Sequence, residues 1–455
     1  MIQPKQPYRP ILFFAALSCL FAFCNPAKKA STTTTGHRPG VIKPGVPAKN
    51  EPVDTIRWTP APPGKPPIRD AQAAAGETPY TGQSYRLALL LPFLSDQFDS
   101  STQDLPQKSN LALQFYAGAN LALQQLSTED GMNLSVDVFD TQSNDADFRR
   151  LFSNPRLDKA QVLIGPIRPS HVGIMAERIR QTHQILISPE SPNMDLTSRN
   201  PDFIQINPSL RAHCAAITRY VLGRHRPDAV TLVCKQKEAD RLAFFQQANA
   251  PGAPRFAELA VPDATANFDN IDLKPYFKPG RTAVFILPVW ASQDFVMAFL
   301  RKLRTARSGN PVEVYGMPQW RNFENIEPEY FAEMNVHISS ASYLDRAAPE
   351  ARAFRQAFYD TYGTVPDDEA YNGYDVTLFA GKMLKKFGLS FPQRLAAEEA
   401  FQGLHTDFQF AKVFSDHTAG LQNPTDRNLD RYDYLENIFV HILKFQNYKF
   451  TPMEN

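Results

Sequence analysis

Tyr85-Arg86-Leu87-Ala88-Leu89-Leu90-Leu91-Pro92 is an almost uninterrupted apolar run that a proline closes. A strand buried on both faces of a parallel sheet has this continuous pattern, whereas a half-exposed strand alternates polar and apolar residues. Two shorter runs, within Val162–Pro166 and Ile185–Pro189, repeat the pattern and also end in proline. The three runs predict neighbouring strands of one parallel sheet.

The segments between these strands have a helical period. Apolar residues fall on one helix face in two sets: Phe115, Ala119, Ala122 and Leu126, then Val172, Met175, Ala176 and Ile179. Strands that alternate with such helices predict a doubly wound parallel sheet. The alternation resumes with strands at 230–233, 283–287 and 312–315, which indicates a second α/β unit.

The composition is that of a soluble globular protein. The chain has 455 residues, of which 43% are hydrophobic and 21% charged, so two or three domains are expected. A mean hydropathy of −0.36 excludes a multi-span membrane protein. A net charge of +1 argues against a nucleic-acid partner, because such proteins usually carry a marked basic excess.

The first residues have the order of an export signal. Lys5 and Arg9 precede a mostly apolar run, Ile11–Phe23, that is too short to span a bilayer as an ordinary helix. Cys24 follows, which resembles the lipidated cysteine of a bacterial lipoprotein. We therefore expect residues 1–24 to be a lipoprotein-type signal with Cys24 as the lipid site, and Cys19 as the less favoured one. A cleaved soluble signal and an uncleaved anchor remain alternatives.

Residues 25–84 hold a large share of the 38 prolines and few large apolar side chains. Such a stretch cannot bury enough apolar surface to offset the entropy of ordering. It predicts a disordered, proline-rich tether between a membrane anchor and a folded body that begins near Tyr85.

The order of elements in the body resembles the type I periplasmic-binding-protein family, which includes the branched-chain amino acid binding proteins of ABC importers and the ligand-binding regions of related receptors. The stretches that carry the resemblance are Val162–Ser170, Ile185–Pro189, Asn200–Ser209, Phe358–Pro366 and Ala370–Asp375. The resemblance implies two Rossmann-like lobes with parallel sheets, joined by three crossovers. It implies a first lobe of 85–205 plus 341–405 and a second lobe of 206–340 plus 406–455.

A ligand in this family would sit between the lobes, beyond the carboxyl ends of the strands. The residues that follow the predicted strands, and that we expect to contact it, are Arg168, Ser170, Ser188, Glu190, Ser191, Trp290, Gln319 and Trp320. Ser170 begins a helix, so it can cap that helix while free backbone N–H groups face an anion. Hinge closure is the expected motion.

Two departures from the family pattern argue against a simple α-amino acid ligand. The stretch Gly316–Trp320 lacks the acidic residue that usually takes the ligand ammonium, and Glu190 stands beside the expected carboxylate cradle. Plainer roles also stay open: Ser170 as an ordinary cap, Arg168 with Glu190 as a local salt bridge, and the two tryptophans as packing residues.

The sequence favours a binding protein over an enzyme. It contains no HExxH, GxSxG or Walker motif and no spaced Cys/His cluster, so we expect no metal and no cofactor. The first expectation is an exported, membrane-anchored protein that binds or senses a small polar ligand and works with an ABC permease or an envelope protein. The alternative is a ligand-free structural adaptor of the cell envelope, similar to the lipoprotein activators of penicillin-binding proteins.

Cys214 and Cys234 form the one cysteine pair of the body. The first lies in a predicted helix, and the second ends the strand that follows it. A helix packed antiparallel to that strand can bring the two Cα atoms within the roughly 4.4–6.8 Å that a disulfide needs. Two buried free thiols are the other expectation.

Overall fold

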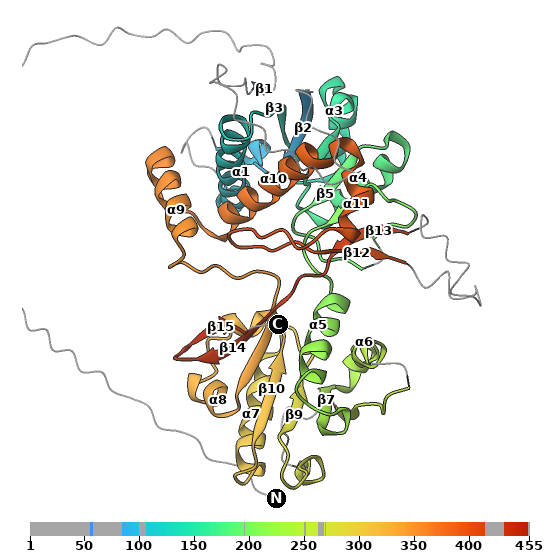
Figure 1. Cartoon of the computed structure of the whole chain (residues 1–455), viewed down its shortest axis with the longest axis vertical. Coiled ribbons are helices and arrows are strands. Elements are labelled where there is room, and N and C mark those ends of the chain that lie inside the picture. Colours follow the sequence, from blue (N-terminus) through green and yellow to red (C-terminus); the bar gives the residue numbers. More distant parts are fainter. Residues whose placement is uncertain are drawn as a thin grey trace, which may run out of the picture. The chain divides into compact units, whose positions relative to one another are not determined.

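The computed structural model describes residues 84–99, 106–194, 196–249, 252–262, 268, 270–414 and 432–453, and the backbone of 55–57. The expected signal, Cys19, Cys24 and most of the expected tether lie outside the described residues. The predicted fold class is confirmed: the described chain forms two α/β lobes, each built on a mostly parallel sheet (Figure 1).

Lobe one, as we call it, is built on a sheet in the order β1-β3-β2-β4-β5-β6-β13-β12. Its strands are β1 (Thr55–Arg57), β2 (Ser84–Leu91), β3 (Asn133–Asp140), β4 (Val162–Ile164), β5 (Ile185–Ser188), β6 (Phe203–Gln205), β12 (Phe410–Val413) and β13 (Tyr434–Asn437). Its helices are α1 (Asn110–Thr128), α2 (Asp145–Arg150), α3 (Pro155–Lys159), α4 (Pro169–Thr182), α9 (Pro349–Tyr362), α10 (Asp368–Phe387) and α11 (Phe391–Arg394). The inner strands from β3 to β13 pair in parallel, and β1 and β12 are antiparallel edge strands.

The continuous apolar run of β2 is explained by helices on both faces of this sheet. Leu87, Leu89 and Leu91 pack in one cluster with apolar residues of α1 and α10. Ala88 and Leu90 point the other way, into a cluster with the apolar face of α4. Because successive residues of a strand face opposite sides, a strand covered twice must be apolar at every position.

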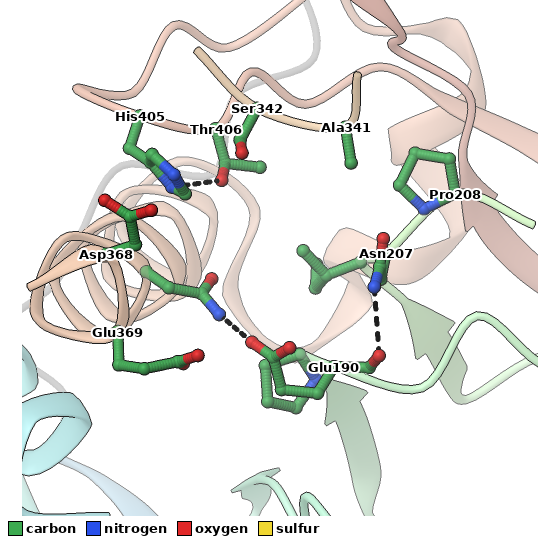
Figure 2. A pocket seen from close by; sticks show the side chains of 12 residues that line it. Glu190, Asn207, Pro208, Ala341, Ser342, Asp368, Glu369, His405 and Thr406 are labelled. Atoms are coloured by element: carbon green, nitrogen blue, oxygen red, sulfur yellow. Dashed lines mark hydrogen bonds between the residues drawn. The ribbon is translucent and has the colours of Figure 1, made fainter. Parts of the chain in front are cut away.

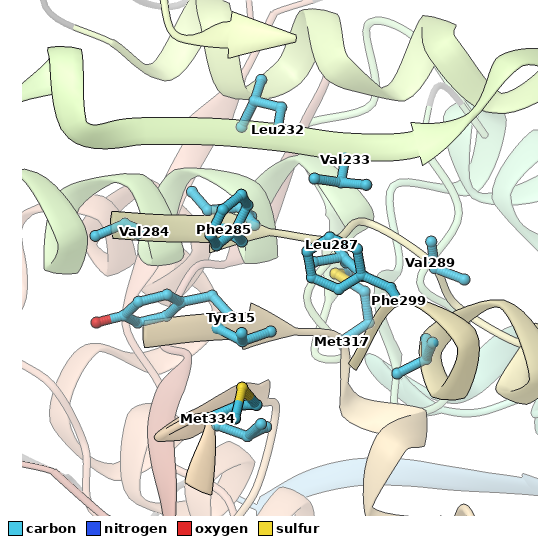
Figure 3. Packing of buried hydrophobic residues seen from close by; sticks show 14 of the residues in the cluster. Leu232, Val233, Val284, Phe285, Leu287, Val289, Phe299, Tyr315, Met317 and Met334 are labelled. Atoms are coloured by element: carbon cyan, nitrogen blue, oxygen red, sulfur yellow. The ribbon is translucent and has the colours of Figure 1, made fainter. Parts of the chain in front are cut away.

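Lobe two has its own sheet, in the order β15-β14-β11-β10-β9-β7-β8. Its strands are β7 (Val230–Lys235), β8 (Ala257–Val261), β9 (Ala283–Ile286), β10 (Val312–Gly316), β11 (Val336–Ser340), β14 (His441–Gln446) and β15 (Lys449–Pro452). Its helices are α5 (Leu210–Leu222), α6 (Leu242–Ala248), α7 (Gln293–Ala306) and α8 (Pro328–Glu333). Figure 3 shows the core of this lobe, where Phe285 on β9 and Phe299 on α7 pack with their ring centroids 5.4 Å apart.

Three connections join the lobes, as the resemblance implied: β6 to α5, β11 to α9, and β13 to β14. The third lies later in the chain than expected. We predicted that residues from 406 onward join lobe two, but β13 pairs with β6 and β12 pairs with β13. Phe408 explains the difference, because its ring stacks on Phe379 of α10, with the centroids 4.7 Å apart. Lobe one therefore continues to β13, and the chain returns to lobe two only at β14.

The structure also places a strand inside the stretch that we expected to lack secondary structure. β1 pairs antiparallel with β3, with Thr55 opposite Asp137 and Arg57 opposite Ser135. An open sheet edge offers unpaired backbone groups, and a short extended segment such as β1 can pair with them. The expectation of disorder thus does not hold for these three residues.

The two cysteines of the body form no disulfide with each other. Cys214 on α5 and Cys234 on β7 are both buried and free, and both belong to the hydrophobic core of lobe two. Burial raises the pKa of both thiols, that of Cys234 to about 11. The second of our two expectations is therefore the correct one: each cysteine packs as a small apolar side chain.

Candidate functional site

A cavity of about 190 Å³ lies beside two of the connections between the lobes. It is lined by residues from five segments: Pro189 and Glu190 after β5; Ile206, Asn207 and Pro208 after β6; Ala341 and Ser342 after β11; Asp368, Glu369 and Asn372 on α10; and His405 and Thr406. Figure 2 shows Glu190 and Glu369 near one another on one side and His405 with Thr406 on the other. Three of the five segments directly follow strands, which is where open α/β sheets bind ligands.

The loops after β5 and β6 are tied to each other. The side-chain amide of Asn207 donates a hydrogen bond to the backbone carbonyl oxygen of Glu190, at 3.0 Å (Figure 2). Asn207 stands at the first connection between the lobes, so this bond couples the connection to the loop that carries Glu190. A movement of the connection would therefore also move the loop that lines the cavity.

The first turns of α10 present three polar side chains to the cavity. Asp367 caps the helix, since its side chain accepts hydrogen bonds from the backbone N–H groups of Glu369 and Ala370. Asn372 follows Glu369 by three residues and Asp368 by four, so it lies on the same side of the helix as both. The Asn372 amide donates a hydrogen bond to the Glu190 carboxylate, which joins α10 to the loop after β5.

The segment with His405 and Thr406 is held by one buried carboxylate. Asp375 of α10 accepts hydrogen bonds from the backbone N–H groups of Leu404, His405 and Thr406, at 2.8, 2.8 and 2.9 Å. Buried polar groups are normally paired in this way. Asp375 thus fixes a turn that has no regular secondary structure, and with it one wall of the cavity.

The cavity has an acidic character. Burial raises the pKa of the Glu190 carboxyl, and it raises that of Glu369 to about 8, with repulsion from Glu190 as the next cause. Burial lowers the pKa of His405 to about 4, so that its imidazole is neutral at pH 7. None of the lining residues is a lysine or an arginine. Two neighbouring carboxyls with raised pKa values hold at least part of a proton between them near neutrality.

Of the residues predicted to contact a ligand, only Glu190 lines this cavity. Arg168 and Ser170 are exposed at the start of α4. Ser170 is not the cap, because the helix begins at Pro169 and the Ser170 hydroxyl donates to Asp145 at 2.8 Å. No ion pair between Arg168 and Glu190 is present among the described residues.

Ser188 and Ser191 are buried at the end of β5 and just after it. Their hydroxyl oxygens have no hydrogen-bond partner within the described part of the chain. They therefore stand next to the cavity in sequence, but they do not line it.

The residues predicted on lobe two do not line this cavity either. Trp320 is fully buried, and its indole N–H donates to the carbonyl oxygen of Val289 at 2.9 Å. Its ring covers Gly316, where a Cβ atom would lie only 2.4 Å from the indole. Trp290 is half-buried with its ring edge-on to His213, and Gln319 is half-buried. The packing role that we left open for Trp320 is therefore the observed one.

The polar cavity residues that the sequence reasoning missed are Asn207, Ser342, Asp368, Glu369, Asn372, His405 and Thr406. Two signals were available: Asn207 lies in Asn200–Ser209 and Asn372 in Ala370–Asp375, stretches that we used for the resemblance but not for the site. The other missed residues had no signal, because nothing local marks a residue that follows a crossover or a turn.

None of the helices in the described part of the chain is long and apolar enough to cross a membrane. The described residues also contain no group of three or more His, Cys, Asp or Glu side chains placed to hold a metal ion.

Comparison with known families decides the relationship. A family model described as periplasmic binding protein matches residues 107–425, which is well over half of the chain. The chain belongs to the type I periplasmic binding protein family. Membership in this family goes with binding of a substrate rather than with catalysis. None of the curated proteins matches this binding protein.

Solved structures agree with the fold of this binding protein. A putative branched-chain amino acid ABC transporter from Rhodospirillum rubrum is 15% identical, over 82% of this chain and 100% of that one, with a TM-score of 0.56. An ABC transporter substrate-binding protein from Desulfitobacterium hafniense is 16% identical, over 82% and 100%, with a TM-score of 0.52. A branched-chain amino acid ABC transporter periplasmic ligand-binding protein from Burkholderia xenovorans is 10% identical, over 81% and 94%, with a TM-score of 0.52. At such identities the likeness concerns the fold alone.

Proposed function

We propose that this periplasmic binding protein binds a small polar ligand in the cavity lined by Glu190, Asn207 and Asn372. The observation that carries the proposal is the cavity itself, which is polar, lies at strand ends and is bordered by two of the three connections between the lobes. A site bordered by the connections can respond to hinge motion, because a ligand there contacts the segments that bend. The substrate-binding character of the family supports the same conclusion.

A thermal-shift screen of the full chain tests this proposal. A compound bound only by the native state raises stability by about 2.7 kcal/mol at a hundredfold excess over its dissociation constant, so a hit raises Tm. Asn372→Ala should abolish the shift, because it removes an amide from the cavity wall. Asn325→Ala is the matched control, since Asn325 is exposed in a turn of lobe two and should leave the shift unchanged. A shift that survives Asn372→Ala places the ligand elsewhere.

The ligand-free adaptor is the second candidate, and one observation favours it. The turn that the resemblance implied as an anion cradle is not free, because the Ser170 hydroxyl is bound to Asp145 and Arg168 is exposed. A structural role needs no ligand, so a strain lacking this chain would be rescued by the Asn372→Ala variant as well as by the wild type. Rescue by the wild type alone supports solute binding instead.

We further propose that the protein is exported and held to a membrane by a lipid on Cys24, with residues 25–54, which precede β1, as tether. The basic–apolar–cysteine order of residues 1–24 supports this. A fatty-acid analogue should label the wild type and Cys19→Ser but not Cys24→Ser. Loss of label in Cys19→Ser alone would place the lipid on Cys19. Absence of label from the wild type and both variants would contradict the lipid anchor.

A further inference from the structure

We propose, building on the solute-binding role above, that the cavity selects a ligand with a positively charged group, an ammonium or a guanidinium, held between the carboxyls of Glu190 and Glu369. The geometry points to this class because the two acids come from different elements and meet at one wall. Glu190 lies in the loop after β5, whereas Glu369 lies on the first turn of α10. Figure 2 shows both at the same side of the cavity.

The Oε2 atom of Glu369 is a separate indication of a missing donor. This oxygen is shielded from solvent and has no hydrogen-bond partner within the described residues. A buried acceptor left without a donor costs about 1–3 kcal/mol, and native proteins rarely tolerate it without a reason. The Asn372 amide donates to Glu190. An ammonium or guanidinium group brings several N–H donors and a charge, so it satisfies the remaining acceptor and offsets the repulsion between the two acids.

The groups around Glu190 and Glu369 are either negatively charged or neutral. Asp367 and Asp368 begin α10 beside Glu369, and both raise its pKa. His405, on the facing turn, is neutral at pH 7 because burial lowers its pKa. The segment after β11 contributes Ala341 and Ser342, which carry no charge.

Positive charges line a neighbouring cavity of about 520 Å³, which shares Asp368 and His405 with the first. Its cationic residues are Arg321, Arg346 and Lys449. Arg346 lies 3.9 Å from Asp368, and both side chains are well exposed, so this contact is a weak surface pair. None of the three lines the acidic cavity. In the empty cavity the retained proton offsets part of the charge of Glu190 and Glu369, and the charge that pairs with both ionised carboxylates must come with the ligand.

This arrangement couples binding to proton release. A cation pairs with ionised carboxyls, whereas the empty pair retains a proton to a higher pH than isolated carboxyls do. Binding at neutral pH therefore expels the retained proton to solvent, and no covalent bond changes. The affinity for a cation rises with pH until the pair is fully ionised, and then levels off.

Isothermal titration calorimetry of the full chain tests the inference with matched probes. 1,4-Diaminobutane is the cationic probe, and 1,4-butanediol has the same length without charge. We expect the diamine to bind at least tenfold more tightly at pH 7, and at least tenfold more tightly at pH 8 than at pH 6. Titrations in buffers of different ionisation enthalpy should show a fraction of a proton released on binding.

Glu369→Gln should weaken diamine binding at least tenfold and remove the proton release, because the amide keeps the shape but not the charge. Glu350→Gln is the matched control, since Glu350 is an exposed acid in the first turn of α9. Glu190→Gln is the second test variant and should act like Glu369→Gln, which guards against a variant that fails to fold. Circular dichroism establishes folding of each form.

The possible outcomes distinguish a failure of the cationic ligand class from a failure of the solute-binding function. Diamine binding that is independent of pH and unaffected by Glu369→Gln and Glu190→Gln overturns the inference. A neutral or anionic compound that stabilises the chain, and loses its effect in Asn372→Ala, overturns the cationic class but leaves solute binding intact. If the diamine does not bind and no screened compound shifts Tm, both proposals fail together.

Discussion

Trp320 and Glu190 both follow strands, and the same reasoning led us to place both at a ligand site. Their environments differ. Trp320 lies on a glycine and is covered on all sides, with its one polar atom bonded to a backbone carbonyl. Glu190 is a carboxylate at a cavity wall, and its charge makes full burial costly. A position after a strand therefore identified candidate site residues. The chemistry of each side chain then decided whether it packs in the core or lines the cavity.

Trp320→Ala should lower the free energy of unfolding by about 3–5 kcal/mol, because it removes a fully buried aromatic side chain and leaves a void. Trp290→Ala, at a half-buried position after a neighbouring strand, should cost clearly less. Urea unfolding followed by circular dichroism measures both. A smaller loss for Trp320→Ala than for Trp290→Ala would contradict the packing role.

At the scale of elements, the contact between α1 and α10 places the cavity wall. A Cβ atom on Gly118 of α1 would lie 1.8 Å from the carbonyl oxygen of Ala370, and one on Gly373 of α10 would lie 2.0 Å from that of Phe115. The two helices therefore approach backbone to backbone, which only glycine permits. Because Glu369 and Asn372 stand within one turn of this contact, the crossing also sets where they point.

Gly373→Ala should destabilise the protein by about 2 kcal/mol or more, since a backbone oxygen cannot move aside as a flexible side chain can. Gly173→Ala on α4 is the matched control. The nearest atom to its added Cβ would be 3.8 Å away, so the better helix propensity of alanine should stabilise by about 0.5–1 kcal/mol. Thermal unfolding of the two variants measures opposite shifts in Tm. Equal shifts in Tm would mean that the close approach of α1 and α10 does not contribute to stability.

At the scale of the whole molecule, buried histidines contribute to the response to acid. Burial lowers the pKa of His213, His337, His405 and His441 to about 4, from an ordinary value of 6.5. At these four histidines the unfolded chain therefore binds more protons than the folded chain between these two pH values. The stabilisation is fully present above pH 6.5 and is lost as the pH falls toward 4.

Each such histidine lowers the free energy of unfolding by up to about 1.4 kcal/mol per pH unit as the pH falls from 6.5 to 4.5. Six carboxyls with raised pKa values act in the opposite direction, because they favour the folded state on acidification: Glu190, Asp202, Asp367, Glu369, Asp375 and Asp407. The contribution of one histidine is therefore measured by comparing the wild type with His337→Gln, which should lose less stability on acidification. Calorimetry from pH 8 to pH 4.5 measures Tm of both forms, and a difference between them that does not change with pH would contradict the assignment of a neutral buried imidazole to His337.

The sequence by itself determined the elements and the fold class of this protein. The run at Tyr85–Pro92, the helical faces of α1 and α4, and the alternation of strand and helix are local patterns, and local backbone geometry dictates them. The family resemblance then added the two lobes and the three connections between them.

Only the tertiary structure decided where the third connection lies and which residues form the cavity. β12 and β13 joined lobe one because Phe408 and Phe410 match the aromatic surface of α10, a fit that no local pattern records. The hydrogen bond between Asn372 and Glu190 joins residues 182 positions apart. Periodicity acts over a few residues, whereas a binding cavity depends on which distant side chains the packed helices and crossovers bring together.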